Sequence, residues 1–189
     1  IFTLGHLCLS AGDSDAALEL LDLGLETSPA DLALRAMHIG ALEQAARYRD
    51  AIAAAQQITR LDPGFDAKWR EITLLLRYGQ NEDALKACDR LDAMAGLNAS
   101  HKAAIAMVRA QLLRILGDRN ESIGAFQQSL ELNPANANAW WGLADLKTYK
   151  FTDQDRAALE KLMARPGLHP QEKCMAAFAL AKAEERKDA

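Results

Sequence analysis

Apolar and polar positions along this chain alternate with the period of an α-helix. Apolar side chains recur three or four residues apart, so each run covers one stripe of a helix and leaves polar residues elsewhere. Such stripes are formed by Leu18, Leu21 and Leu25, by Ile105, Val108, Leu112 and Leu116, and by Ile123, Phe126 and Leu130. No run has the pattern of a strand, so the sequence predicts an all-α chain of short amphipathic helices.

Prolines mark a repeat along the chain. Pro63 lies 34 residues after Pro29, and Pro134 lies 71 residues after Pro63, which is two periods plus three residues. A proline just past a helix end cannot continue that helix. A period of 34 residues suits two helices of about a dozen residues each, joined by short turns. The spacing therefore predicts helical hairpins in series.

Within each period a polar turn separates the two helices. The turns lie at Gly12–Asp15, Arg47–Asp50, Gly79–Asp83 and Gly117–Asn120. Glycine is common where a helix ends in the left-handed conformation, and Asp or Asn caps the helix that follows. The second turn departs from this pattern because it has no glycine.

Residues at fixed places in these periods resemble the tetratricopeptide repeat (TPR) family. The matching residues are Ala17 and Pro29 in the first period, Trp69 and Ala84 in the third, Ala110, Gly117, Asp118, Phe126 and Pro134 in the fourth, and Trp140 in a fifth. The second period is weaker, because Arg35 replaces the usual aromatic residue and His38 the usual leucine. The resemblance implies an all-α, right-handed α-α superhelix, a TPR-like solenoid of antiparallel helix hairpins.

The resemblance also implies boundaries for the repeat units. The hairpins are expected at about 1–31, 32–65, 66–102 and 103–136, with a half unit at 137–147. Extra residues around 96–100 predict a lengthened turn capped by Ser100. Residues 148–189 leave the repeat and are expected to form a helical extension, the start of a linker to a missing C-terminal domain. The register begins inside a helix, so we expect a piece of a longer protein.

Two helices are expected in the extension. Thr152 should cap the first, at about 153–164, with Asp155 at its third position as the acidic partner. The second should run from about 171 to 186, after a break that contains Pro166 and Gly167.

A second resemblance covers residues 139–183. The run Ala139–Thr148, then Phe151-Thr152, Pro166-Gly167-Leu168 and Phe178–Ala183, is similar to the join between a TPR array and a sulfotransferase domain in a bacterial family. That resemblance implies a parent that uses phosphoadenosine phosphosulfate. Its chemistry needs a phosphate-binding loop between a strand and a helix, and the sequence contains none. We therefore expect a non-catalytic part of a larger protein, without a catalytic residue or cofactor of its own.

Charge and composition narrow the partners. The chain carries 22 Lys and Arg residues interspersed with 26 Asp and Glu residues, for a formal net charge of −4. This balance gives no electrostatic reason to bind nucleic acid or an anionic membrane, and no apolar run approaches the roughly 20 residues of a membrane span. Cys8, Cys88 and Cys174 lie far apart in helical segments, so we expect buried thiols, a reducing compartment and a cytoplasmic location. The four histidines lack metal-ligand spacing.

The resemblance places the binding surface on the first helix of each hairpin, which lines a groove in TPR arrays. Register nominates Arg70, Leu74 and Arg77, then Met107, Gln111 and Arg114, then Trp141 and Asp145. Arginine favours carboxylates, and Met and Trp supply apolar contact, so the expected partner is a protein or peptide with an acidic group and an apolar anchor. The alternatives are that the arginines are only solvated, that Met107 is core, and that Trp141 packs under residues 148–165.

Three functions remain open from the sequence. The chain is a scaffold that binds a peptide or protein in the groove, or it is the accessory part of a sulfotransferase. The third alternative is a stand-alone adaptor or self-assembly module, in which exposed hairpin edges stack two copies into a homo-oligomer.

Overall fold

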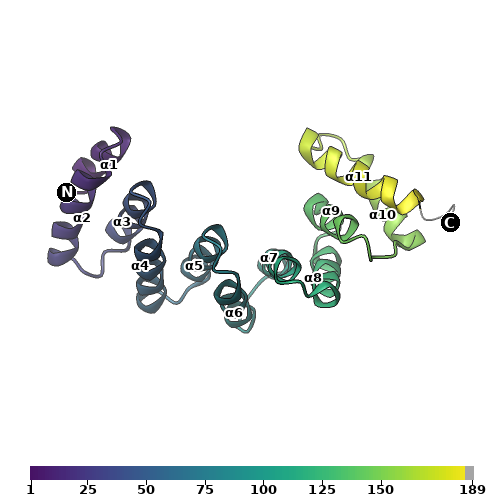
Figure 1. Ribbon diagram of the computed structural model, residues 1–189, viewed down its shortest axis with the longest axis horizontal. Helices are drawn as coiled ribbons and strands as arrows, with labels where there is room; N and C mark the ends of the chain where they lie inside the picture. Colours follow the sequence, from purple (N-terminus) through teal and green to yellow (C-terminus); the bar gives the residue numbers. More distant parts are fainter. Residues whose placement is uncertain (186–189) are drawn as a thin grey trace. The chain divides into compact units, whose positions relative to one another are not determined.

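The computed structural model describes residues 1–185, and this part of the chain folds into eleven α-helices without a strand (Figure 1). The helices are α1 Phe2–Ser10, α2 Ser14–Thr27, α3 Leu32–Gln44, α4 Tyr48–Leu61, α5 Phe65–Arg77, α6 Asn81–Asp92, α7 Ala99–Leu116, α8 Arg119–Leu132, α9 Ala137–Asp145, α10 Asp153–Met163 and α11 Pro170–Glu185. The predicted all-α fold of consecutive helices is confirmed.

The helices belong to two compact units, Ile1–Ala87 and Cys88–Ala189, and the boundary between them falls within α6. In the first unit each helix from α1 to α4 packs against the helix that follows it in the chain. In the second unit α7 packs against α8, α8 against α9, and α11 against both α9 and α10. Apart from the contact of α11 with α9, these helices pack against their neighbours in the sequence, as expected of helical hairpins in series.

Small and branched apolar residues form the core of the first unit. Ala17, Leu21 and Ala41 are fully buried, and Leu42 and Ala51 are buried beside them. Alanine at a helix contact lets two backbones approach closely, while leucine fills the space between the alanines. The regular spacing of the stripes therefore has a direct structural reason, because each stripe faces the neighbouring helix.

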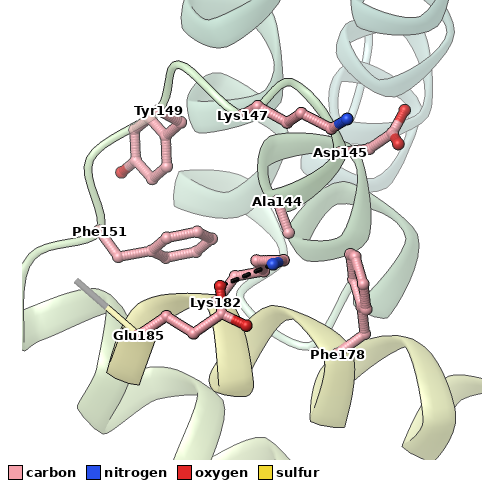
Figure 2. Close-up of a pocket in the computed structure, with 8 residues that line it drawn as sticks. All are labelled: Ala144, Asp145, Lys147, Tyr149, Phe151, Phe178, Lys182 and Glu185. Atoms are coloured by element: carbon pink, nitrogen blue, oxygen red, sulfur yellow. Dashed lines mark hydrogen bonds and ion pairs between the residues drawn. The ribbon is translucent and has the colours of Figure 1, made fainter.

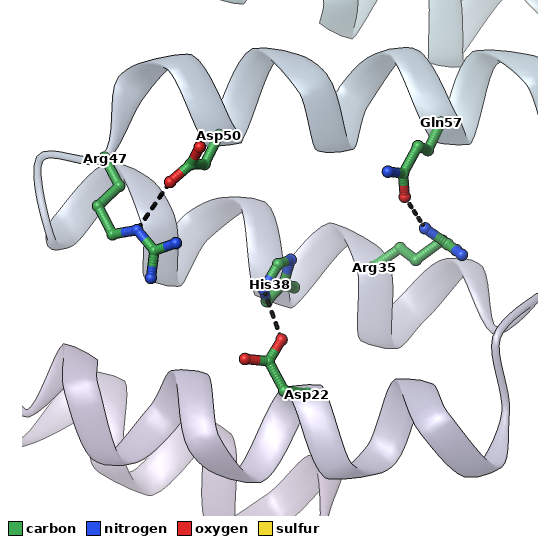
Figure 3. Close-up of polar contacts among 6 residues, drawn as sticks. All are labelled: Asp22, Arg35, His38, Arg47, Asp50 and Gln57. Atoms are coloured by element: carbon green, nitrogen blue, oxygen red, sulfur yellow. Dashed lines mark hydrogen bonds and ion pairs between the residues drawn. The ribbon is translucent and has the colours of Figure 1, made fainter.

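Arg35 and His38, the polar residues at which the second repeat departs from the TPR sequence pattern, make specific contacts in the first unit (Figure 3). The Arg35 side chain donates hydrogen bonds to the Gln57 amide oxygen at 2.7 Å and to the Pro29 carbonyl at 2.6 Å. His38 Nε2 lies 3.1 Å from an Asp22 carboxylate oxygen. These bonds join α3 to both of its neighbours, α2 and α4, so polar contacts replace apolar packing at these two positions.

The turns between paired helices share a left-handed residue. Gly12, Gly79 and Gly117 have φ of +82°, +74° and +91°, and Ala46 has +57° in the turn that lacks glycine. Lys147 takes the same conformation, with φ +58°, after the end of α9. A residue with a β-carbon is strained there, so the second and fifth turns keep the geometry of the others without the residue that favours it.

The joint between the third and fourth hairpins differs from its prediction. Helix α7 begins at Ala99, and its cap is Asn98, whose side-chain oxygen accepts a hydrogen bond from the His101 amide at 2.8 Å. The prediction of Ser100 as the cap was wrong. Asn98 comes first in the chain, and Asn is among the best N-cap residues.

The predicted cap of the first C-terminal helix is confirmed. The Thr152 hydroxyl accepts a hydrogen bond from the Asp155 amide at 3.1 Å, and the Asp155 carboxylate accepts one from the Thr152 amide at 2.8 Å. Helix α11 begins at Pro170, and the predicted end at Arg186 lies outside the described residues. The prediction of buried cysteines holds for Cys88, but Cys8 is only partly buried and Cys174 is exposed.

Candidate functional site

Three of the nominated residues come together in the second unit. The Arg114 guanidinium donates a hydrogen bond from Nη1 to an Asp145 carboxylate oxygen at 3.0 Å. The same guanidinium carbon lies 5.8 Å from the centre of the Trp141 ring. Trp141 and Asp145 stand one helical turn apart on α9, and Arg114 stands in the last turn of α7. The structure therefore joins α7 and α9 through a cation that contacts both an acid and an aromatic face.

This ion pair lies at the surface. The Arg114 side chain is 32% exposed and that of Asp145 is 39% exposed. A pair with that exposure contributes about 0–1 kcal/mol to stability, because water screens the two charges. Its main effect is to hold the guanidinium in one orientation above α9, where a ligand could contact it.

A basic pocket of about 390 Å³ opens beside the pair. It is lined by Arg114, Arg119, Asp145, Leu146, Lys147 and Thr148. Arg119 is the first residue of α8, and Lys147 follows the end of α9 in its left-handed conformation. Three basic side chains against one acidic side chain give the lining a net positive charge, which favours an anionic group.

A second, more apolar pocket of about 290 Å³ lies along α9 and α11. Its lining consists of Ala144, Asp145, Lys147, Tyr149, Phe151, Phe178, Lys182 and Glu185. Figure 2 shows Phe151 and Phe178 on either side of Ala144 and Lys182. Asp145 and Lys147 line both pockets, so the basic pocket and the apolar pocket adjoin.

Buried aromatic residues hold Phe151 in place. Its ring stacks on Trp140 with 6.5 Å between centroids and meets the edge of Tyr149 at 5.0 Å. The Trp140 indole donates a hydrogen bond to the Pro134 carbonyl at 3.0 Å, and the Tyr149 hydroxyl donates one to Asp155 at 2.8 Å. Burial, together with the bond to Asp155, raises the pKa of Tyr149 to about 12. The tryptophan that packs under the extension is thus Trp140, while Trp141 faces Arg114.

The remaining nominated residues of the second unit do not line either pocket. Met107 and Gln111 lie on α7, one to two turns before Arg114, and are partly buried. Their register is that of Arg114, so they extend the same face of the helix. Their role as ligand contacts stays a prediction.

The nominated residues of the first unit have different environments. Arg70 is exposed, and Arg77 forms an ion pair with Glu43, which also accepts a hydrogen bond from the Tyr78 hydroxyl at 2.7 Å. The nomination of Leu74 is corrected, because this side chain is only 3% exposed and belongs to the hydrophobic core. Its position on the helix was right, but that side of α5 faces a neighbouring helix rather than solvent.

Several pocket residues escaped the sequence analysis. Phe151, Phe178 and Lys182 come from the extension, where the repeat register gives no guide. Arg119 and Lys147 lie at helix ends, where the groove positions of the repeat do not apply. The one available signal was Lys147, which occupies the place after a helix that glycine fills in other turns.

Within residues 1–185 the structure shows no group of three or more His, Cys, Asp or Glu residues that could hold a metal ion. None of the helices described is long and apolar enough to cross a membrane. Burial raises the pKa of the Cys88 thiol to about 12, helped by the negative charge of Asp89, so this cysteine is not a nucleophile near neutral pH.

Comparison with known sequences and structures decides the family. The sequence model of the tetratricopeptide repeat matches residues 37–99 and 107–146, more than half of the chain. The chain belongs to the tetratricopeptide repeat family. The TPR match ends just before Lys147, so the basic pocket lies at its edge and the apolar pocket lies partly outside it.

Solved TPR structures share the fold. MamA of Desulfovibrio magneticus, residues 41 to its end, aligns with a TM-score of 0.62 and 18% identity, covering 99% of this chain and 94% of that one. YrrB, a TPR protein with an unusual peptide-binding site, aligns with a TM-score of 0.57 and 16% identity, covering 100% of this chain and 90% of that one. A tetratricopeptide repeat protein from Parabacteroides merdae aligns with a TM-score of 0.62 and 17% identity, covering 98% of this chain and 74% of that one. These likenesses confirm the predicted TPR-like solenoid of antiparallel hairpins.

No match is found among curated proteins. The resemblance of residues 139–183 to a sulfotransferase join therefore gains no support from the comparisons, which return TPR proteins.

Proposed function

We propose that this TPR chain is a non-catalytic scaffold that binds a peptide or protein segment on the face formed by α7, α9 and α11. The TPR family and the fold support a binding role, and the structurally similar TPR protein YrrB has a peptide-binding site. The observation that carries the proposal is the pair of adjoining pockets, whose lining includes Arg114 on α7 and Asp145 on α9, two of the residues that the repeat register nominates as ligand-facing.

The charge of the basic pocket favours a partner with an acidic group. Arg114, Arg119 and Lys147 surround it, and Asp145 is the single acid of its lining. A carboxylate placed between guanidinium and ammonium groups gains charge-assisted hydrogen bonds, which are stronger than neutral ones. This proposal keeps Arg114, Trp141 and Asp145 from the sequence prediction and confines the site to the second unit.

A peptide selection tests the binding role. The purified chain is immobilised and used to select from a phage library of random 12-residue peptides. Arg114→Glu serves as the site variant, and Arg70→Glu serves as a matched control because it reverses an exposed arginine of the first unit. We expect selected peptides to be rich in Asp and Glu and to lose at least tenfold in affinity with Arg114→Glu alone. Selected peptides that bind both variants equally well would place the binding surface elsewhere.

Two other roles are kept as proposals with narrower support. A larger parent protein with a sulfotransferase domain, using phosphoadenosine phosphosulfate, rests on the sequence resemblance of residues 139–183 alone. The amino-acid sequence that follows Ala189 in the parent tests it, because the enzyme needs a strand, a phosphate-binding loop and a helix there.

Self-assembly into a homo-oligomer is favoured by one surface of the first unit. Ile1, Phe2, Leu4 and Leu7, at the start of α1 and along it, are between 46% and 59% exposed. An apolar row of this kind can bury itself against a second copy. Light scattering over a range of concentrations tests this role, and a constant monomer mass would exclude it.

A further inference from the structure

We infer that the two pockets act as one site that recognises an acidic residue next to a large apolar residue, with Lys147 as the residue that contacts both. This inference rests on the proposed function and names the class of peptide it serves. Lys147 lines the basic pocket and the apolar pocket, and it lies in the short segment that joins α9 to Phe151.

The backbone of Lys147 is the first observation. Its φ of +58° lies in the left-handed region, which glycine fills in the turn after α7, where Gly117 has φ +91°. A residue with a β-carbon loses stability in that conformation relative to glycine. Strained non-glycine residues of this kind cluster at functional sites. Ala46 shares this backbone conformation but lines neither pocket, whereas the left-handed residue after α9 is a lysine that lines both.

The balance of charge is the second observation. Arg119 makes no hydrogen bond or ion pair through its side chain within the described part of the chain, while Arg114 is already paired with Asp145 at 3.0 Å. An acidic ligand group beside Arg119 would reduce the net positive charge of the lining without breaking the Arg114 pair. The basic pocket thus favours an acidic ligand group.

The apolar pocket supplies the other half of the site. Phe178 is 40% exposed on α11 and lines the apolar pocket, so its ring is open to a ligand. Lys182 Nζ lies 5.9 Å from the centre of its ring and is held by Glu185 at 2.6 Å, so the aliphatic part of Lys182 lies along the pocket (Figure 2). Phe151 closes the opposite side on its fixed aromatic support. An aromatic or leucine side chain in this pocket would contact the phenylalanine rings and the aliphatic part of Lys182.

Synthetic peptides of defined composition test the inference. Fluorescein-labelled Gly/Ser peptides carry Glu and Phe separated by no, one or two residues, and matched peptides carry Glu with Ala or Gln with Phe. Fluorescence anisotropy measures their affinity for the full chain. We expect the best Glu/Phe peptide to bind at least tenfold more tightly than either matched peptide, and Phe178→Ala to remove the advantage of Phe over Ala.

Lys147→Gly is the decisive variant. Glycine relieves the left-handed backbone, so the Tm should stay equal or rise, while the affinity for the Glu/Phe peptide should fall at least fivefold. Ala46→Gly is the matched control, because Ala46 has φ +57° in the first unit and lines neither pocket. Its Tm should rise in the same way with unchanged peptide affinity.

Each of the following outcomes would overturn the inference. Unchanged affinity in Lys147→Gly would exclude Lys147 as a ligand contact, and a lower Tm would make its role structural. Equal binding of all the peptides would exclude joint recognition. If the selected library peptides depend on Arg114 but lack an acidic and apolar pair, the inference fails while the binding role stands. If neither the library nor the panel yields a binder, both fail.

Discussion

At the scale of single residues, one glycine decides how α9 fits the second unit. A β-carbon built on Gly142 would lie 2.3 Å from Cζ of Phe126, and the Phe126 ring is fully buried. The ring therefore rests directly on the α9 backbone, in space that only a glycine leaves open. This contact joins α8 to α9 and so supports the helix that carries Trp141 and Asp145.

Gly142→Ala should destabilise the protein by about 1–3 kcal/mol, because the added methyl group forces a buried ring to move. Gly124→Ala is the matched control in the same unit, since Gly124 is a helical glycine with open space around its β-carbon position. The control should gain up to about 1 kcal/mol from helix propensity. Urea denaturation followed by circular dichroism measures both, and the same change in stability for the two variants would refute the packing argument.

His38 makes the first unit sensitive to acid. Burial lowers the pKa of His38 below its usual 6.5, and the nearby charges of Arg47 and Arg35 act in the same direction, while Asp22 opposes them. The unfolded chain then binds more protons than the folded chain below pH 6.5. The stability contributed by neutral His38 is therefore fully present above pH 6.5 and is lost as the pH falls through the lowered pKa.

His38→Leu should reduce this loss, since leucine has no charge to bury. The measurement is the fall in the free energy of unfolding between pH 7.0 and pH 5.0, compared between the two proteins. Carboxylates titrate over the same range in both proteins. The difference between the two proteins in their loss of unfolding free energy therefore reports the contribution of His38. An identical fall would show that His38 becomes protonated without cost in the folded state.

At the scale of helices, two buried serines fasten α8 to α7. The Ser122 hydroxyl donates a hydrogen bond to the Ala110 carbonyl at 2.9 Å, and the Ser129 hydroxyl donates one to the Ala103 carbonyl at 3.0 Å. Both serines are fully buried. The two serines are seven residues apart on α8, and the two alanines are seven residues apart on α7. Seven residues make close to two helical turns, so the two bonds repeat along one antiparallel contact. They set the register of the hairpin that presents Arg114 and Arg119.

Ser122→Ala and Ser129→Ala should each cost about 0.5–1.5 kcal/mol, the usual net contribution of one hydrogen bond. The double variant should lose about the sum, because the two bonds lie at separate places on the helix contact. Thermal denaturation measures the three variants. A double variant that loses no more than one single variant would show that the serines act as a single network.

At the scale of the whole molecule, stability should be local. Helices pack against their neighbours in the chain, so a change in one hairpin is felt mainly by the hairpins beside it. Hydrogen exchange of Gly142→Ala should show faster exchange in the unit that contains residues 88–185 and little change between residues 1 and 80. Uniformly faster exchange along the chain would instead show that the two units unfold as one cooperative body.

Much of the fold follows from local physical chemistry. Periodic apolar residues and closing prolines predict the helices, because both act within a few residues of their own position. The cap formed by Thr152 and Asp155 was predictable for the same reason. Leu74 and Ser100 were misassigned because burial and the choice between two neighbouring caps depend on what packs around them.

The sequence by itself determined the repeat, the family and the nomination of Arg114, Trp141 and Asp145, since these depend on spacing along one helix. Only the tertiary structure decided that Arg119, Lys147, Phe151 and Phe178 lie beside them. These residues come from helix ends and from the extension, where no period relates them, and α11 reaches the site by packing on α9. A pocket depends on which elements meet, and that is a property of packing rather than of local pattern.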